Sequence, residues 1–172
     1  HGKALAIVRP GSTEEVAALV DIVGRYRGTL SADRSDLLKR YRIIDVARKV
    51  VGVGSVGTRC WVLLLEGRTP EDLLVLQAKE AGPSVLEPYV RKSAYRHQGR
   101  RVVEGQRLTQ ATSDIFLGWA NGLDASRHFY VRQLHDMKGG VDPDRMPVTN
   151  LRHYAEICGL ALARAHARAG GA

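Results

Sequence analysis

Three glycines, one serine and one lysine have the residue types and the order needed to bind phosphate groups. Gly52, Gly54 and Gly57 follow a G-x-G-x-x-G pattern with Ser55 inside it, and Lys79 comes later in the chain. Because glycine has no Cβ, the backbone N–H groups of such a turn can approach phosphate oxygens closely, and a lysine ammonium balances their charge. These five residues therefore form a predicted site for the phosphates of a nucleotide.

Two kinds of fold use glycines at this spacing, and the residues after Gly57 distinguish them. In a dinucleotide-binding Rossmann unit the glycines open a helix. Here Trp61–Leu65 is rich in aromatic, β-branched and other apolar residues and is followed by Glu66-Gly67, which favours a short strand. The glycines are therefore expected to join two antiparallel strands, as in protein-kinase-like folds. In those folds a lysine in the third strand pairs with the nucleotide phosphates, and Leu73–Ala81 predicts that strand around Lys79.

A carboxylate on the helix after the lysine strand would complete such a site, because kinases use a glutamate there to hold the lysine in an ion pair. The candidate helix runs from Arg100 to Ser113, and Glu104 on it is the first choice. Glu87, in a short helical piece that begins at Ser84, is the second choice. Lys79 and Glu104 are thus the predicted catalytic pair, and no metal ligands are assigned.

Each of these features also has an ordinary structural explanation, which the sequence leaves open. Glycines at this spacing serve any tight hairpin or close backbone approach. A lysine at a strand end, or a single glutamate on a helix, is usually solvated.

Two further strands, Asp114–Trp119 and His128–Leu134, complete an expected antiparallel sheet of five strands with one inserted helix. The segment His135–Gly140 is polar and contains glycines, which is typical of a hinge. We expect backbone groups of Gln133 and Leu134, at the end of the preceding strand, to meet the adenine edge of ATP.

The rest of the chain is predicted to be helical, and the fold class is α+β. Apolar residues at helical spacing indicate helices from Ser12 to Tyr26, from Ser35 to Tyr41 and from Asn150 to Ala169. The expected organisation is an amino-terminal helical segment at 1–41, a nucleotide-binding small lobe at 42–135, and a hinge with the first helix of a larger lobe at 136–172.

The composition excludes some classes of protein. With 44% hydrophobic and 26% charged residues the chain resembles a globular protein, and its longest apolar runs are too short to cross a bilayer, so no membrane partner is expected. The amino terminus lacks the apolar region of a secretory signal, which favours a cytoplasmic setting. Two cysteines, Cys60 and Cys158, do not suggest a disulfide framework and are expected to be buried thiols.

The formal charge of +8 allows a different kind of function. Clustered Lys and Arg can bind nucleic acid or an acidic partner without any catalysis. The basic residues here are not interleaved with aromatic residues that could stack on bases, so a solvated basic face is favoured over nucleic-acid binding. A non-enzymatic basic interaction module remains the alternative to a nucleotide-binding lobe.

A set of segments between about Leu37 and Arg168 has a pattern in common with a known family: Arg48–Gly57, Leu76–Ala81, Arg101–Arg107, Asp114–Trp119, Tyr130–Leu134 and Leu162–Arg168. Together they resemble the carboxy-terminal half of a bacterial family called domain of unknown function 2252. In this family an amino-terminal half carries G-D-x-H-x-x-N-F and N-D-F-D segments that are similar to the catalytic and metal-binding loops of aminoglycoside phosphotransferases. The resemblance implies a circularly permuted kinase-like fold, with those loops ahead of the glycine hairpin.

The present chain lacks the segments that correspond to the catalytic and metal-binding loops of that family. It holds no G-D-x-H-x-x-N segment, and neither His135-Asp136 nor Asp114-Ile115-Phe116 has the spacing of a catalytic or metal-binding loop. We therefore expect a fragment or a truncated product that is inactive alone, binds ATP weakly at most, and uses magnesium only if the missing loops are supplied. The partners expected are a nucleotide and the remainder of a longer parent chain.

Overall fold

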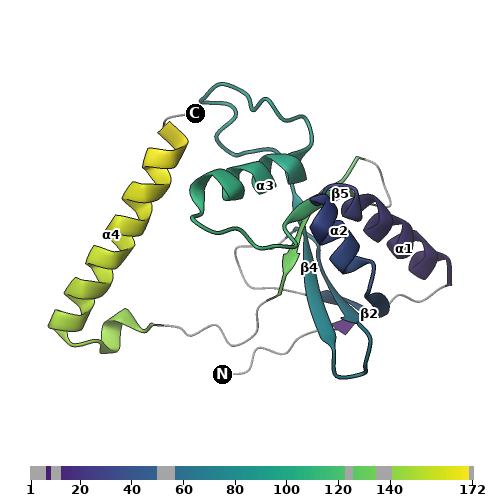
Figure 1. Ribbon diagram of the computed structural model, residues 1–172. Helices are drawn as coiled ribbons and strands as arrows, with labels where there is room; N and C mark the ends of the chain where they lie inside the picture. Colours follow the sequence, from purple (N-terminus) through teal and green to yellow (C-terminus); the bar gives the residue numbers. More distant parts are fainter. Residues whose placement is uncertain (1–6, 9–12, 50–56, 123–125, 135–140, 171–172) are drawn as a thin grey trace. The chain divides into compact units, whose positions relative to one another are not determined.

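The computed structural model describes residues 7–8, 13–49, 57–122, 126–134 and 141–170. Within these residues the chain forms α-helices, one 3-10 helix and a single antiparallel sheet (Figure 1), which confirms the α+β class. The chain divides into two compact units. Unit 1 comprises residues 1–103 and 114–134, and unit 2 comprises residues 104–113 and 135–172.

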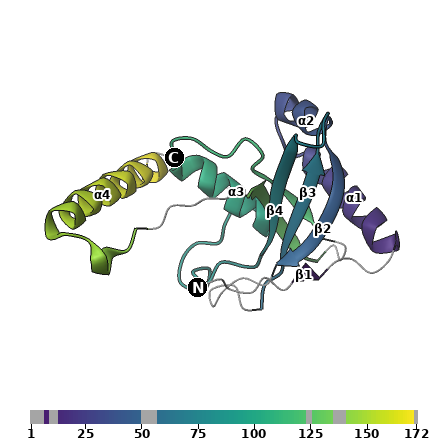
Figure 2. The ribbon, with the colours of Figure 1, turned by 90° about the horizontal axis from the view of Figure 1, so that it is seen from below.

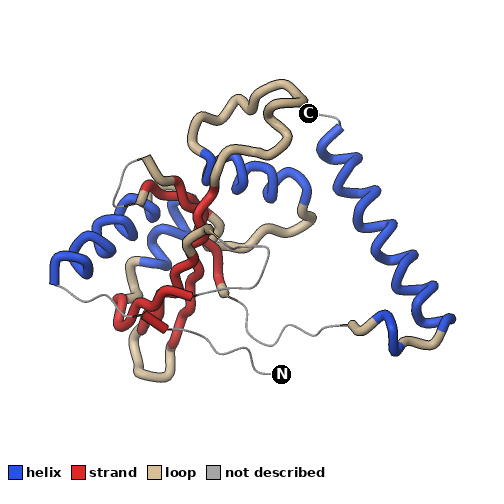
Figure 3. Tube along the Cα trace, turned by 180° about the vertical axis from the view of Figure 1, so that it is seen from behind, coloured by secondary structure: helices blue, strands red, loops and turns tan. Residues whose placement is uncertain are grey.

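The sheet of unit 1 has the strand order β1-β2-β3-β4-β6-β5, and every neighbouring pair is antiparallel. Figure 3 shows these strands as one red layer. The predicted five strands are present, and the two-residue β1 adds a sixth at one edge. The strand bounds are β1 Ile7–Val8, β2 Arg42–Lys49, β3 Cys60–Glu66, β4 Leu73–Ala81, β5 Gly118–Asn121 and β6 His128–Gln133.

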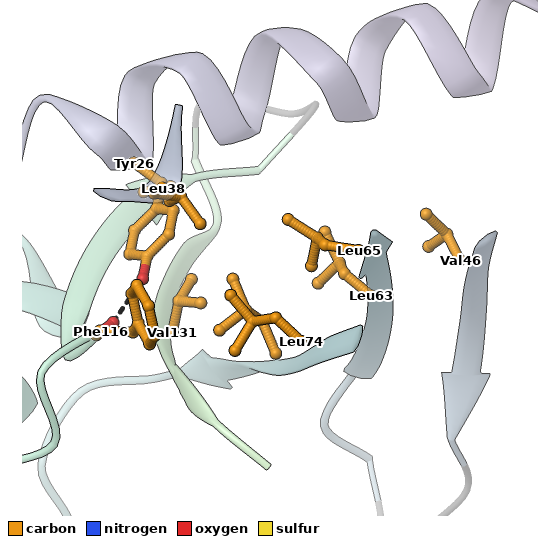
Figure 4. Close-up of a cluster of buried hydrophobic side chains, with 10 residues drawn as sticks. Tyr26, Leu38, Val46, Leu63, Leu65, Leu74, Phe116 and Val131 are labelled. Carbon is orange, nitrogen blue, oxygen red and sulfur yellow. Dashed lines mark hydrogen bonds between the residues drawn. The ribbon is translucent and has the colours of Figure 1, made fainter. Parts of the chain in front are cut away.

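One face of this sheet carries the hydrophobic core. Successive side chains of a strand point to opposite faces, and in β3 and β4 the alternate residues Leu63, Leu65, Leu74 and Leu76 are buried together. Helices α1 (Thr13–Arg27) and α2 (Ala32–Leu38) cover this face and contribute Tyr26 and Leu38 to the core, as Figure 4 shows. Because the hydrophobic effect buries these side chains on one face of the sheet, the opposite face is the one available for other contacts.

The opposite face meets the start of α3 (Gln98–Thr109), as seen in Figure 2. At Gly99 the helix backbone comes so close to β6 that an added Cβ would lie 2.1 Å from the carbonyl oxygen of Phe129. Val103 is fully buried. The lysine strand is thus followed by a helix, as expected, although the helix begins at Gln98 and contains Gly99 instead of starting after it.

Two predicted elements are wrong in detail. Asp114–Trp119 is not one strand: β5 begins only at Gly118, because the Asp114 carboxylate accepts the Phe116 N–H at 2.8 Å and holds a turn there. The segment after Ser84 forms turns in place of a short helix. In that segment the N–H of Glu87 donates to the carbonyl of Ser84 at 3.1 Å.

Unit 2 contains the 3-10 helix Pro143–Arg145 and the long helix α4 (Val148–Gly170). No side chain of α4 is buried, and its Cys158 is exposed, so the expectation of a buried thiol is correct for Cys60 and wrong for Cys158. Neither Cys60 nor Cys158 forms a disulfide. None of the helices in the described ranges combines the length and hydrophobicity that a bilayer crossing requires.

Candidate functional site

The glycine segment lies between two antiparallel strands. Arg48 of β2 pairs with Trp61 of β3, and β3 starts at Cys60, so a strand and not a helix follows Gly57. Gly57 itself has a φ of 87°, in the left-handed region that favours glycine. This arrangement confirms the predicted hairpin connection and excludes the Rossmann interpretation. The predicted phosphate ligands Gly52, Gly54 and Ser55 lie outside the described residues.

Lys79 lies on β4, directly opposite the residue at which the hairpin returns to the sheet. Its partners in the strand ladder are Cys60 of β3 and Tyr130 of β6, and Tyr130 in turn pairs with Trp119 of β5. Residues directly opposite each other in antiparallel strands share a face. Lys79 is therefore the cationic member of a row that crosses four strands, on the face of the sheet opposite the core.

The Lys79 side chain is half-buried, and no hydrogen bond or ion pair of its ammonium occurs among the described residues. The residues on either side of Lys79 are partly or fully shielded from water. Cys60 is buried on one side, where its Sγ accepts a hydrogen bond from Gln77 Nε2 at 3.1 Å. On the other side, burial raises the pKa of Tyr130. A cation in such a setting is screened less by water than one on an open surface, so it attracts an anion more strongly.

The next residue, Glu80, fixes the end of the hairpin from the other face of the sheet. Its Oε2 accepts the backbone N–H of Arg59 at 3.0 Å, and its own N–H donates to the Arg59 carbonyl at 2.9 Å. The carboxylate also forms ion pairs with Arg59, at 3.4 Å, and with Arg127, at 3.6 Å. One largely buried carboxylate thus connects β4 with the residues that immediately precede β3 and β6.

Gln133 and Leu134 are in the predicted place, at the end of β6, but their N–H groups are already bonded. The Gln133 N–H donates to Asp114 Oδ2 at 2.6 Å, and the Leu134 N–H donates to the carbonyl of Val75 at 2.9 Å. The two donors that would meet an adenine edge are therefore used by the fold itself. The expected hinge, His135–Gly140, lies outside the described residues.

The amino-acid sequence of the chain matches a known protein family. Residues 3–172 match the family described as "Uncharacterized protein conserved in bacteria (DUF2252)". The chain belongs to this family. Neither the curated proteins nor the solved structures gave a match. The match extends beyond the region from Leu37 to Arg168 in which the sequence showed its resemblance.

The two candidate carboxylate partners of Lys79 belong to different units of this DUF2252 chain. Glu104 lies on the part of α3 that belongs to unit 2, where its Oε1 is 3.5 Å from the guanidinium of Arg107 on the same helix. Lys79 belongs to unit 1, so its pairing with Glu104 stays a prediction. Glu87 lies in a turn of unit 1 and is half-buried.

Sequence reasoning missed Glu80 and Tyr130 as neighbours that shape the surroundings of Lys79. Glu80 could have been noticed because a carboxylate next to a strand lysine points to the other face, where a charged group needs a partner when it is buried. Tyr130 gave no local signal, since its place opposite Lys79 depends on strand register. Within the described part of this DUF2252 chain, no three His, Cys, Asp or Glu side chains gather to hold a metal ion.

Proposed function

We propose that unit 1 binds the phosphates of ATP as the small lobe of a kinase-like phosphotransferase. The observation that carries this proposal is the position of Lys79, directly opposite Cys60, where the glycine hairpin re-enters the sheet. A turn rich in glycine N–H groups and an adjacent strand lysine are the two elements that hold nucleotide phosphates in kinases. Here the first residue of the strand that follows the glycine segment pairs directly with the strand lysine.

The phosphate end of the proposed site suits an anion. The Lys79 ammonium is half-buried and forms no ion pair among the described residues, and a bound phosphate would gain a charge-assisted hydrogen bond from it. The conformation of Gly57, with a φ of 87°, turns the backbone at the end of the hairpin. These features support binding of the triphosphate more strongly than binding of the base.

At the adenine end of the proposed site, the backbone donors expected from the sequence already have partners. Because the N–H groups of Gln133 and Leu134 are bonded to Asp114 and Val75, neither is a free donor to adenine. The proposal therefore rests on the phosphates and assigns no acceptor substrate. Glu104 enters it only as the residue proposed to orient Lys79 within a complete enzyme.

Calorimetric titration of the chain with ATP, with and without magnesium, tests the proposal. Replacing Lys79 by Met keeps an unbranched apolar side chain while removing the charge, and we expect the Kd for ATP to rise about tenfold or more. Lys92→Met is the matched control, because Lys92 is exposed in the same unit and carries the same charge.

Two results would contradict the proposal. One is no measurable binding of ATP by the wild-type chain, and the other is an equal loss of binding in Lys79→Met and Lys92→Met. Salt-sensitive binding to DNA or RNA that ignores Lys79→Met would instead support the basic interaction module.

A further inference from the structure

Two histidines that are distant in sequence stack at the junction of α3 and β6. His97 directly precedes α3 and His128 is the first residue of β6, and their ring centroids lie 4.1 Å apart with the planes inclined by 27°. Both rings receive hydrogen bonds from the first turn of α3. The Gln98 N–H donates to His128 Nδ1 at 3.0 Å, and the Arg100 N–H donates to His97 Nδ1 at 3.1 Å.

These bonds define the protonation state of both rings. A ring nitrogen that accepts a hydrogen bond carries no proton, so each imidazole is neutral, with its proton on Nε2. An imidazolium has a proton on both nitrogens and can only donate. Protonation of either ring would place an N–H against an N–H of the helix and a positive charge beside the positive end of the helix dipole.

The surroundings of His97 favour its neutral form on balance. Burial lowers the pKa of His97 and the neighbouring His128 lowers it further, while hydrogen bonding to the Asn121 side chain and to nearby backbone opposes these effects in part. His97 Nε2 and Asn121 Oδ1 are both buried. Among the described residues no carboxylate forms an ion pair with either ring.

Three arginines on the segments around the two histidines, Arg100, Arg101 and Arg127, interact with other groups. The guanidinium of Arg100 stacks over the rings of Tyr95 and Trp119, at 5.1 and 5.4 Å from their centroids. Arg101 donates to the Gly82 carbonyl and to the Gln98 side chain. Arg127, which precedes His128, pairs with Glu80.

The first turn of α3 packs closely against β6 beside the two histidines. Gly99, which lies between the two donors Gln98 and Arg100, packs against the backbone of Phe129 so tightly that an added Cβ would lie 2.1 Å from its carbonyl oxygen. Without the two imidazole acceptors, the N–H groups on both sides of this contact would lose their partners. The Gln98 bond is partly buried, so its loss is costly and the helix start would have to move toward water to satisfy that N–H, whereas the Arg100 N–H is exposed and can bond to water in place.

We propose that His97 and His128 form a pH-sensitive latch, which holds the first turn of α3 on β6 while both rings accept their hydrogen bonds and releases it when His97 is protonated. In the released state a histidine titrates near its ordinary pKa of about 6.5, whereas in the closed state the pKa of His97 is lower. The latch therefore contributes its full stability above about pH 6.5 and loses it as the pH falls through the lower, closed-state pKa. This device does not depend on nucleotide binding.

Hydrogen exchange of the full chain, measured between about pH 8 and pH 5, tests the latch. After correction for the intrinsic pH dependence of exchange, the amides of Gln98 and Arg100 should lose protection by up to about tenfold for each pH unit between the released-state pKa of about 6.5 and the lower closed-state pKa, and should lose no more below it. Amides in the centre of β3 and β4 should keep their protection. Unchanged protection at Gln98 and Arg100 over this range would overturn the proposal.

The matched variant is the double substitution His97→Asn with His128→Asn. Asparagine places an oxygen acceptor near the position of Nδ1 but does not titrate, so the amides of Gln98 and Arg100 should stay protected at low pH. His153→Asn, at an exposed position of α4, should keep the wild-type pH dependence. A double variant that loses protection at low pH as the wild type does would refute the latch.

If the double variant does not fold, the wild-type chain still decides the question. Nitrogen-15 spectra of its imidazoles at about pH 8 should show both rings neutral with the proton on Nε2. A proton on Nδ1 of either ring would rule out the acceptor role on which the latch depends.

Discussion

The hydroxyl of Tyr26, near the end of α1, donates a hydrogen bond to the carbonyl oxygen of Phe116, in the turn before β5 (Figure 4). Tyr26 is 1% exposed, and burial, together with the negative charge of Asp114, raises the pKa of its phenol. The phenol therefore stays neutral and able to donate over the whole physiological range. This bond joins the helical cover of the sheet to the segment that leads into its last hairpin.

Tyr26→Phe should destabilise unit 1 while leaving its shape unchanged. The substitution keeps the buried ring but removes the donor, so the Phe116 carbonyl loses a partner at a cost of about 1–3 kcal/mol. Urea denaturation should show this decrease in the free energy of unfolding. Tyr89→Phe is the control, because Tyr89 is 84% exposed and its substitution should change stability by less than about 0.5 kcal/mol. Equal effects of the two substitutions would show that the Tyr26 bond contributes nothing.

The role of Glu80 at the hairpin exit predicts a graded response to two substitutions. Glu80→Gln keeps an oxygen that can accept the Arg59 N–H but removes the ion pairs with Arg59 and Arg127, whereas Glu80→Ala removes both. We expect Glu80→Ala to lower the free energy of unfolding by about 1–3 kcal/mol, and Glu80→Gln to lower it by less. Hydrogen exchange should accelerate at the Arg59 amide in Glu80→Ala only.

Rapid exchange at the Arg59 amide in both variants would mean that charge, and not the hydrogen bond, holds the hairpin exit. Glu71→Ala is the control for loss of a carboxylate, since Glu71 is exposed in the turn before β4. It should leave the exchange of Arg59 unchanged.

The strands of unit 1 could be predicted because their signals are local. In β3 and β4, runs of apolar residues are bounded by turn residues, and these alone indicate strands that pair through short connections. The strand position of Lys79 followed from the same signals. Its face and its neighbours Cys60 and Tyr130 did not, because they depend on register between strands that lie far apart in the sequence.

The errors of prediction arose where a side chain or a tertiary contact replaced a local preference. Ile115-Phe116-Leu117 has the composition of a strand, but Asp114 bonds two backbone N–H groups and bends the chain there. Gly99 looked like a helix boundary, whereas its missing Cβ permits α3 to touch β6. The stack of His97 on His128 could not be predicted from the sequence, because only the fold brings these two distant residues together.

Asp114 should be the residue that holds the end of β6 in place. Its Oδ1 accepts the Phe116 N–H at 2.8 Å and its Oδ2 accepts the Gln133 N–H at 2.6 Å. Asp114→Ala leaves both donors without this partner, and we expect a loss of about 2–4 kcal/mol in the free energy of unfolding, since hydrogen bonds to charged groups contribute more than neutral ones. Hydrogen exchange at Gln133 should become faster in this variant.

A control for Asp114→Ala is Asp142→Ala in unit 2, whose carboxylate accepts the N–H of Asp144 at an exposed site. That bond competes directly with water, so its loss should change stability by less than about 0.5 kcal/mol. Unchanged exchange at Gln133 in Asp114→Ala would show that β6 is held by its strand ladder alone.

Two glycines of α3 should respond to alanine in opposite ways. At Gly99 an added Cβ would lie 2.1 Å from the Phe129 carbonyl oxygen, whereas at Gly105 nothing lies within 4 Å. Gly99→Ala must push the helix start away from β6, so we expect a loss of about 1–3 kcal/mol and weaker protection of the Gln98 and Arg100 amides even at neutral pH. Gly105→Ala should be neutral or stabilise by up to about 1 kcal/mol, because alanine is the better helix former.

Denaturation of both variants at about pH 8, where the histidines are neutral, separates the steric effect at Gly99 from protonation of the latch. Equal stabilities would mean that α3 and β6 are less closely packed than their backbones indicate.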